Sequence, residues 1–88
     1  MPDPVAVLRA LPPTALYDVF AEAASQLLAV YSSMLTAAAS PQQEEELWTR
    51  IYAVRDLRYG VRPEEVDRQI ELILVWQRER TQLDAPEA

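Results

Sequence analysis

The chain has 88 residues, half of them hydrophobic, with fourteen acidic and eight basic side chains and a formal net charge of −6. A chain of this length fits one domain, and its lack of cysteine and histidine excludes disulfide scaffolds, Cys/His zinc sites and catalytic sets that need either residue. All eight bases are arginine, and the negative balance disfavours a nucleic-acid partner, because phosphate binding needs a positively charged face.

Residues 1–12 are predicted to form an arm ahead of the helical body. Met1–Pro4 is acidic and interrupted by proline, whereas a secretion signal begins basic and continues apolar. The most apolar stretch, Leu27–Ala39, is interrupted by Ser32, Ser33 and Thr36 and is shorter than the ~20 residues that cross a bilayer. Within the arm, Val5–Leu11 is expected to form a short helical turn that docks on the body. We therefore expect a cytoplasmic protein with no membrane contact.

A first long helix is predicted over residues 13–39. Apolar residues recur there at spacings of three and four, which places them on one helical face. They are Leu16, Phe20, Ala23, Leu27, Val30, Met34 and Ala38. Asp18 and Glu22 are the only charged side chains between Arg9 and Glu44, and they fall on another face. A helix with so little charge is either enclosed in a core or covered by a partner.

A second helix is predicted over residues 41–59. Ser40 can cap it, Pro41 suits its first position, and Gln43 completes a capping box three residues after the serine. Three successive glutamates follow near its start and three arginines lie towards its end, which is the order that the helix dipole favours. The inner stripe is expected to consist of Leu47, Ile51 and Val54.

A third helix is predicted over residues 63–83, with residues 84–88 as a tail. Its inner seam is expected to consist of Val66, Ile70, Ile73 and Leu74. Leu72, Val75 and Trp76 extend the apolar surface almost around the helix, which is more than one stripe of a three-helix bundle can bury. Part of this apolar run is therefore expected to face outward.

These elements predict an all-α protein, a three-helix bundle with long helices and a short N-terminal arm, folded as one domain over residues 1–88. Trp48 and Trp76 are the large anchors; a small bundle has room to bury one tryptophan, so the other is expected at an interface. Which of the two faces outward does not follow from the sequence. The arginines of Arg50–Arg68, interleaved with aromatic residues, indicate either a face for a carboxylate-rich partner or charge compensation at helix ends.

No catalytic, cofactor-binding or metal-binding residues are predicted. The run Glu44–Glu46 carries oxygens suited to a divalent cation, but no EF-hand loop accompanies it, and a charged helix start explains it more simply. Helical chorismate mutases are similar in length and build three helices into an intertwined dimer. Their site resembles a ring of arginine and lysine side chains that clamps two carboxylates, whereas this chain has no lysine and its first long helix has no arginine.

The segment Leu47–Leu83 resembles the small antitoxins that accompany zeta toxins. The resemblance is carried by an early tryptophan, an arginine-rich helix end, an aromatic residue before a short turn, an acidic helix start and a late tryptophan. It implies a three-helix bundle that binds a P-loop kinase-like toxin and covers the toxin's nucleotide-binding site with its N-terminal helix. Placed on this chain by position, the covering residues are Tyr17, Asp18, Phe20 and Glu22. A carboxylate among them would occupy the anion site that phosphate normally takes.

We therefore expect a non-catalytic protein that binds and neutralises a cytoplasmic zeta-like kinase toxin. The residues expected to bind the partner are Tyr17, Asp18, Phe20, Glu22, Trp48, Arg55, Leu72, Val75 and Trp76. A homo-oligomeric structural or adaptor protein, such as a homodimer, is the first alternative, because excess apolar surface serves self-association equally well. A small helical enzyme of the chorismate mutase type is the second.

Overall fold

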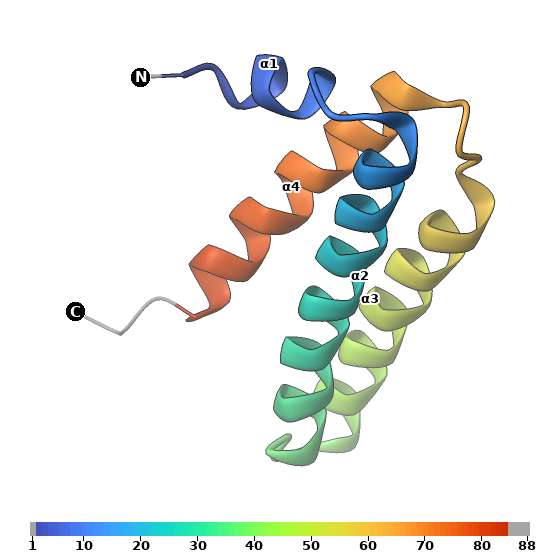
Figure 1. The fold of residues 1–88 in the computed structure, drawn as a ribbon. Coiled ribbons are helices and arrows are strands. Elements are labelled where there is room, and N and C mark those ends of the chain that lie inside the picture. The colour runs from blue at the N-terminus through green and yellow to red at the C-terminus, as the bar shows by residue number, and fades with distance from the viewer. Residues whose placement is uncertain (1, 85–88) are drawn as a thin grey trace.

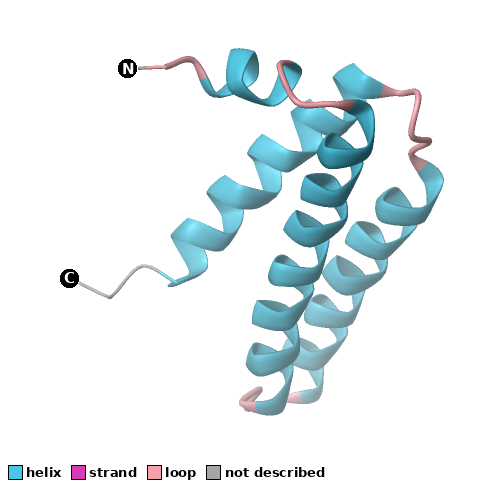
Figure 2. Ribbon diagram, viewed as in Figure 1, coloured by secondary structure: helices cyan, strands magenta, loops and turns pink. Residues whose placement is uncertain are grey.

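The computed structural model describes residues 2–84, and all regular structure in that range is helical. The helices are α1 (Pro4–Arg9), α2 (Pro13–Thr36), α3 (Pro41–Gly60) and α4 (Val66–Asp84), as Figure 1 and Figure 2 show. The prediction of an all-α protein is confirmed, and the arm adds a short helix of its own. Most of the predicted tail lies outside the described residues. Within residues 2–84, no helix combines the length and the apolar character that crossing a membrane requires.

The arm folds as α1 and docks on α4. The carboxylate of Asp3 caps the helix by accepting the backbone N–H of Val5 at 3.0 Å. Arg9 then reaches α4, where its Nη1 lies 2.7 Å from Oδ1 of Asp67. Leu8 packs half-buried against the core. The predicted docking of a short helical turn is therefore confirmed, and one flank of α4 is covered by it.

The connection between α2 and α3 is built around the predicted serine cap. The backbone N–H of Gln43 donates to Oγ of Ser40 at 3.2 Å, and the Gln43 side chain accepts the N–H of Ala39 at 2.9 Å. Because Ser40 is extended, with φ −148° and ψ 154°, the chain must leave α2 before it. α2 accordingly ends at Thr36, three residues earlier than predicted, whereas α3 begins at Pro41 as predicted.

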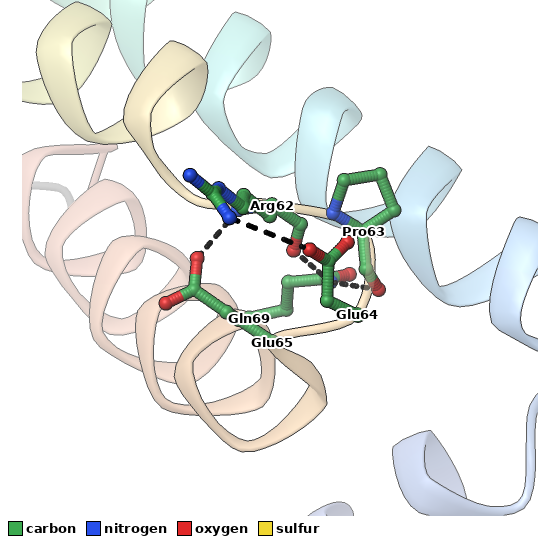
Figure 3. Close-up of polar contacts among 5 residues, drawn as sticks. All are labelled: Arg62, Pro63, Glu64, Glu65 and Gln69. Atoms are coloured by element: carbon green, nitrogen blue, oxygen red, sulfur yellow. Dashed lines mark hydrogen bonds and ion pairs between the residues drawn. The ribbon is translucent and has the colours of Figure 1, made fainter.

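A polar turn separates α3 from α4 and delays the start of α4 (Figure 3). Glu65 accepts the backbone N–H of Arg62 on its Oε2 at 2.7 Å. Gln69 is fully buried, and its Nε2 donates to the carbonyls of Arg62 at 3.0 Å and Pro63 at 2.8 Å. These bonds hold the residues after Pro63 as a turn, so α4 begins at Val66 and not at the proline. The Oε1 of Gln69 is buried without a hydrogen-bond partner.

The core follows the inner face of α2. Phe20 and Leu27 are fully enclosed, together with Ile73 of α4. Trp76 is buried beside them and stacks on Phe20, with ring centroids 5.3 Å apart and an interplanar angle of 24°. In contrast, α3 buries only Leu47 and Val54. The central helix and α4 therefore hold most of the apolar packing.

The helices form a flattened layer with α2 in the middle. α2 packs against both α3 and α4, whereas α3 and α4 contact each other only marginally and diverge (Figure 1). The extents are 43 × 32 × 14 Å, and the radius of gyration of 14.4 Å exceeds the ~12 Å typical of a compact domain of this length. The closed three-helix bundle expected from the sequence is therefore not confirmed.

Candidate functional site

Three of the nine side chains predicted to bind a partner lie inside the core. Phe20, Leu72 and Trp76 are all buried within the chain. They were expected to bind the partner, but in this fold their side chains are not exposed. The reason is that α4 crosses α2 with this side of its apolar run turned inward, where the Trp76 ring stacks on Phe20. Trp76 is therefore the core tryptophan and Trp48 the exposed one.

The other six predicted residues reach the surface but do not converge on one site. The exposed ones are Asp18 and Glu22 on α2, Trp48 and Arg55 on α3, and Val75 on α4. Tyr17 is half-buried, and its hydroxyl accepts a hydrogen bond from Nη1 of Arg58 at 3.1 Å. The Arg58 guanidinium also lies over the Tyr17 ring, 5.4 Å from its centroid. Tyr17 thus connects α2 to α3 in this fold.

Two adjoining hollows follow the opening between α3 and α4, and both are lined by Arg50 and Leu83. The larger has a volume of about 460 Å³ and lies between the end of α2, the start of α3 and the end of α4. Its apolar lining includes Met34 and Leu47. The smaller, of about 340 Å³, continues along α4 past Val75. We call this continuous depression the α3–α4 groove.

A polar junction of three helices lies at the base of the α3–α4 groove. The hydroxyl of Tyr31 on α2, which is buried, donates to the Glu79 carboxylate of α4. Arg50 of α3 approaches the same carboxylate oxygen, with its Nη1 at 3.4 Å. Burial, and then the hydrogen bond to Glu79, raise the pKa of Tyr31 from 10.0 to about 12, so the hydroxyl remains a donor into the alkaline range. The junction thus links the diverging helices through one carboxylate.

This junction was not predicted from the sequence, although one of its residues carried a signal. Tyr31 continues the spacing of the inner face of α2, four residues after Leu27. A buried tyrosine hydroxyl normally finds a hydrogen-bond partner, which would have directed attention to a carboxylate on another helix. Nothing in the local sequence indicates that Glu79 and Arg50 are that carboxylate and its cation, because they meet only after α3 and α4 pack on α2.

A second surface runs along the outer side of α3. Trp48, Tyr52, Arg55 and Tyr59 recur at spacings of four, three and four, so they fall within about 60° of one another around the helix. All four are exposed. The rings of Trp48 and Tyr52 stack with centroids 5.6 Å apart and an interplanar angle of 25°. We call these four residues the outer face of α3. Of the four, only Trp48 and Arg55 were predicted from the sequence to bind a partner.

Asp18 and Glu22 line a separate hollow of about 340 Å³ between α2 and α4. Its other lining includes Gln77 of α4 and Gln26, whose Nε2 donates to Oε1 of Glu22 at 3.0 Å. The hollow is shallow and polar at its rim. It presents two carboxylates to solvent.

Within the part of the chain that the structure describes, no three acidic side chains are grouped as metal ligands. The larger hollow of the α3–α4 groove is lined by one arginine, Arg50, which already pairs with Glu79. Arg78 lines the smaller hollow, so the whole groove contains two arginines.

Comparison with known proteins adds no relative to this picture. No family model matches the chain, and searches of curated proteins and of solved structures return no significant match. The resemblance to the antitoxins that accompany zeta toxins is therefore not supported by these comparisons and stays a prediction.

Proposed function

We propose that this chain acts by binding another polypeptide, and that the α3–α4 groove receives a helix of that partner. The observation that carries the proposal is the divergence of α3 and α4, which both pack on α2 and leave the side between them open (Figure 1). A helix laid into this opening would contact three helices at once. It would complete a four-helix bundle, an arrangement in which such faces are buried.

The lining of the groove defines the kind of helix that fits. Met34 and Leu83 offer apolar contact, and Val75 is 47% exposed farther along α4. Arg78 supplies positive charge beside Val75, whereas Arg50 is paired with Glu79, and Glu46 adds negative charge at the other end of the groove. The matching partner is an amphipathic helix, with apolar side chains about one turn apart towards the groove and an acidic side chain near Arg78.

The resemblance found in the sequence makes this proposal more specific. It names the partner as a zeta-like kinase toxin in the cytoplasm, which the chain neutralises by covering the nucleotide-binding site. Two features support this version: the order of residues over Leu47–Leu83, and the exposed carboxylates of Asp18 and Glu22 on α2. Carboxylates in that position suit the backbone N–H groups of a phosphate-binding loop.

The test begins with the reading frame beside the gene. If the chain is an antitoxin, that frame is expected to encode a protein with a Walker A motif. Expression of that protein alone should stop growth, and co-expression of this chain should restore it. If the neighbour alone is harmless, the antitoxin version is contradicted. The broader proposal is tested by co-purification of the two products.

Matched variants then locate the site. Val75→Arg places charge in the groove, and Val7→Arg makes the same change at a position on α1 that is 51% exposed. Co-purification is expected to fail for Val75→Arg and to persist for Val7→Arg. Equal binding by both variants would exclude the groove. The double variant Asp18→Arg/Glu22→Arg is expected to keep binding but lose the rescue of growth, since it removes only the carboxylates that would cover the nucleotide site.

A further inference from the structure

The outer face of α3 exposes more aromatic surface than any other helix of the described chain. Trp48 is 44% exposed, Tyr52 50% and Tyr59 75%. They lie roughly a third of a turn from Leu47 and Val54, the two side chains that α3 buries. This face is therefore separate from the contact with α2, and large rigid aromatic side chains of this kind dominate protein interfaces.

Charge is divided along the same helix. The first part of α3 carries Glu44 and Glu45 on or beside the outer face, and both side chains are exposed. No basic residue follows them before Arg50. The second half carries Arg55 on the outer face, with the exposed Asp56 next to it in sequence. Arg62 lies just beyond the helix, and its Nη1 is 3.9 Å from Oε1 of Glu64. The outer face therefore has an acidic first end and, at Arg55, a basic group in its second half, with aromatic side chains on either side of Arg55.

We propose that the outer face of α3 binds the same face of a second copy of this chain, with the two helices antiparallel about a two-fold axis. Only the antiparallel arrangement sets each acidic end against Arg55 of the second copy, whereas a parallel arrangement opposes like charges. The division of charge thus makes the face complementary to itself. Because this face is separate from the α3–α4 groove, the inference does not depend on the proposed function.

The spacing of the residues fixes the register. Trp48 and Arg55 are seven residues apart, about 10 Å along the helix, so an axis midway between them brings each to the level of the other on the second copy. An arginine over a tryptophan ring is a favourable cation–π pair, and the symmetry makes two of them. Tyr52 then lies near the axis, beside its counterpart, and Glu45 lies within one helical turn of the second copy's Arg55.

Sedimentation equilibrium of the full chain and two charge-reversed variants tests the proposal. The first variant is Glu44→Arg/Glu45→Arg and the second is Arg55→Glu/Arg62→Glu. The wild-type chain is expected at twice the monomer mass of 10.0 kDa, and each variant alone at the monomer mass, since reversal opposes like charges. An equimolar mixture of the two variants is expected to return to twice the monomer mass. Both variants remain net negative, so net charge does not drive the mixed dimer.

Two further variants control for loss of folding and for dimerisation through a different surface. Trp48→Ala changes an exposed residue and is expected to give a monomer with unchanged circular dichroism. Val75→Arg, in the α3–α4 groove, is expected to remain a dimer. A wild-type monomer at hundreds of micromolar would overturn the proposal, as would charge variants that still form dimers alone or a mixture that stays monomeric. A dimer lost in Val75→Arg but kept in Trp48→Ala would assign self-association to the groove instead.

Discussion

Replacing Tyr31 with phenylalanine tests whether the three-helix junction stabilises the open side of the layer. The hydroxyl of Tyr31 donates to the Glu79 carboxylate, which also pairs with Arg50. A hydrogen bond to a charged group contributes about 1.5–3 kcal/mol. Because the Glu79 side chain is 32% exposed and can regain hydration, we expect a loss near the lower figure, about 1.5 kcal/mol. In a domain of this size that lowers Tm by about 6–12 °C.

The same substitution is expected to remove an alkaline loss of stability. The pKa of Tyr31 is raised from 10.0 to about 12, first by burial and then by its bond to Glu79. Below pH 10 the hydroxyl is protonated in both the folded and the unfolded chain, so its full contribution is present. Between pH 10 and pH 12 the unfolded chain releases the proton while the folded chain retains it. The free energy of unfolding therefore falls as pH rises, by about 1.4 kcal/mol per pH unit and about 2.7 kcal/mol in total.

Urea denaturation followed by circular dichroism over a series of alkaline pH values measures both effects. A chain of this length has a total stability of about 4–13 kcal/mol, so the alkaline loss is a large and measurable share of it. The matched control is Tyr17→Phe, since Tyr17 is half-buried and its hydroxyl accepts from Arg58 instead of donating to a carboxylate. That variant also removes a tyrosine hydroxyl but keeps the bond between Tyr31 and Glu79, so it controls for the loss of a hydroxyl as such. An unchanged slope in Tyr31→Phe, or no loss of stability at neutral pH, would refute the reasoning.

Four further substitutions test other parts of the fold by the same denaturation assay. Trp76→Ala is expected to cost about 3–5 kcal/mol because it empties the stack on the core phenylalanine, whereas Trp48→Ala, at the surface, is expected to cost less than about 1.5 kcal/mol. Ser40→Ala removes the cap of α3 and is expected to cost about 1 kcal/mol. Gln69→Glu sets a buried carboxylate against two carbonyls and is expected to cost more than about 2 kcal/mol at neutral pH. Because burial raises the pKa of the new carboxyl, that cost should shrink as the pH falls and a protonated oxygen can donate again.

Helix positions were largely predictable because proline, serine and glycine mark them locally. The start of α3 at Pro41 depends on a cap that spans four residues of sequence, and the structure forms it as predicted. The start of α4 was predicted three residues early, since Pro63 alone suits a first helical turn. What moved it is the buried Gln69, which reaches back to the carbonyls before it. A side chain six residues away from the proline decides the boundary, and propensity at the boundary itself carries no sign of it.

The candidate surfaces were less predictable because they depend on which helices touch. Residues that share a helix can be grouped by periodicity, and the outer face of α3 is readable in this way from Trp48, Tyr52 and Tyr59. The α3–α4 groove is different, because Leu47 and Leu83 belong to helices that approach each other only across α2. The spacing of residues along the sequence does not show that α3 and α4 both lie beside α2. The contact between Tyr31 and Glu79 was unpredictable for the same reason.

The number of neighbours that each helix has explains where the apolar excess came to lie. The sequence contains more apolar helix than three single stripes can bury, and the prediction placed that excess on the third long helix. In the structure α4 packs against α1 as well as α2, so it is covered on two sides and encloses both Leu72 and Trp76, leaving Val75 outside. α3 lies at the edge of the layer with α2 as its one extensive contact, so it buries a single stripe and exposes Trp48. The same apolar count therefore leaves its exposed part on a different helix, because the arm of the chain covers α4, whereas no other helix of the described chain covers the outer face of α3.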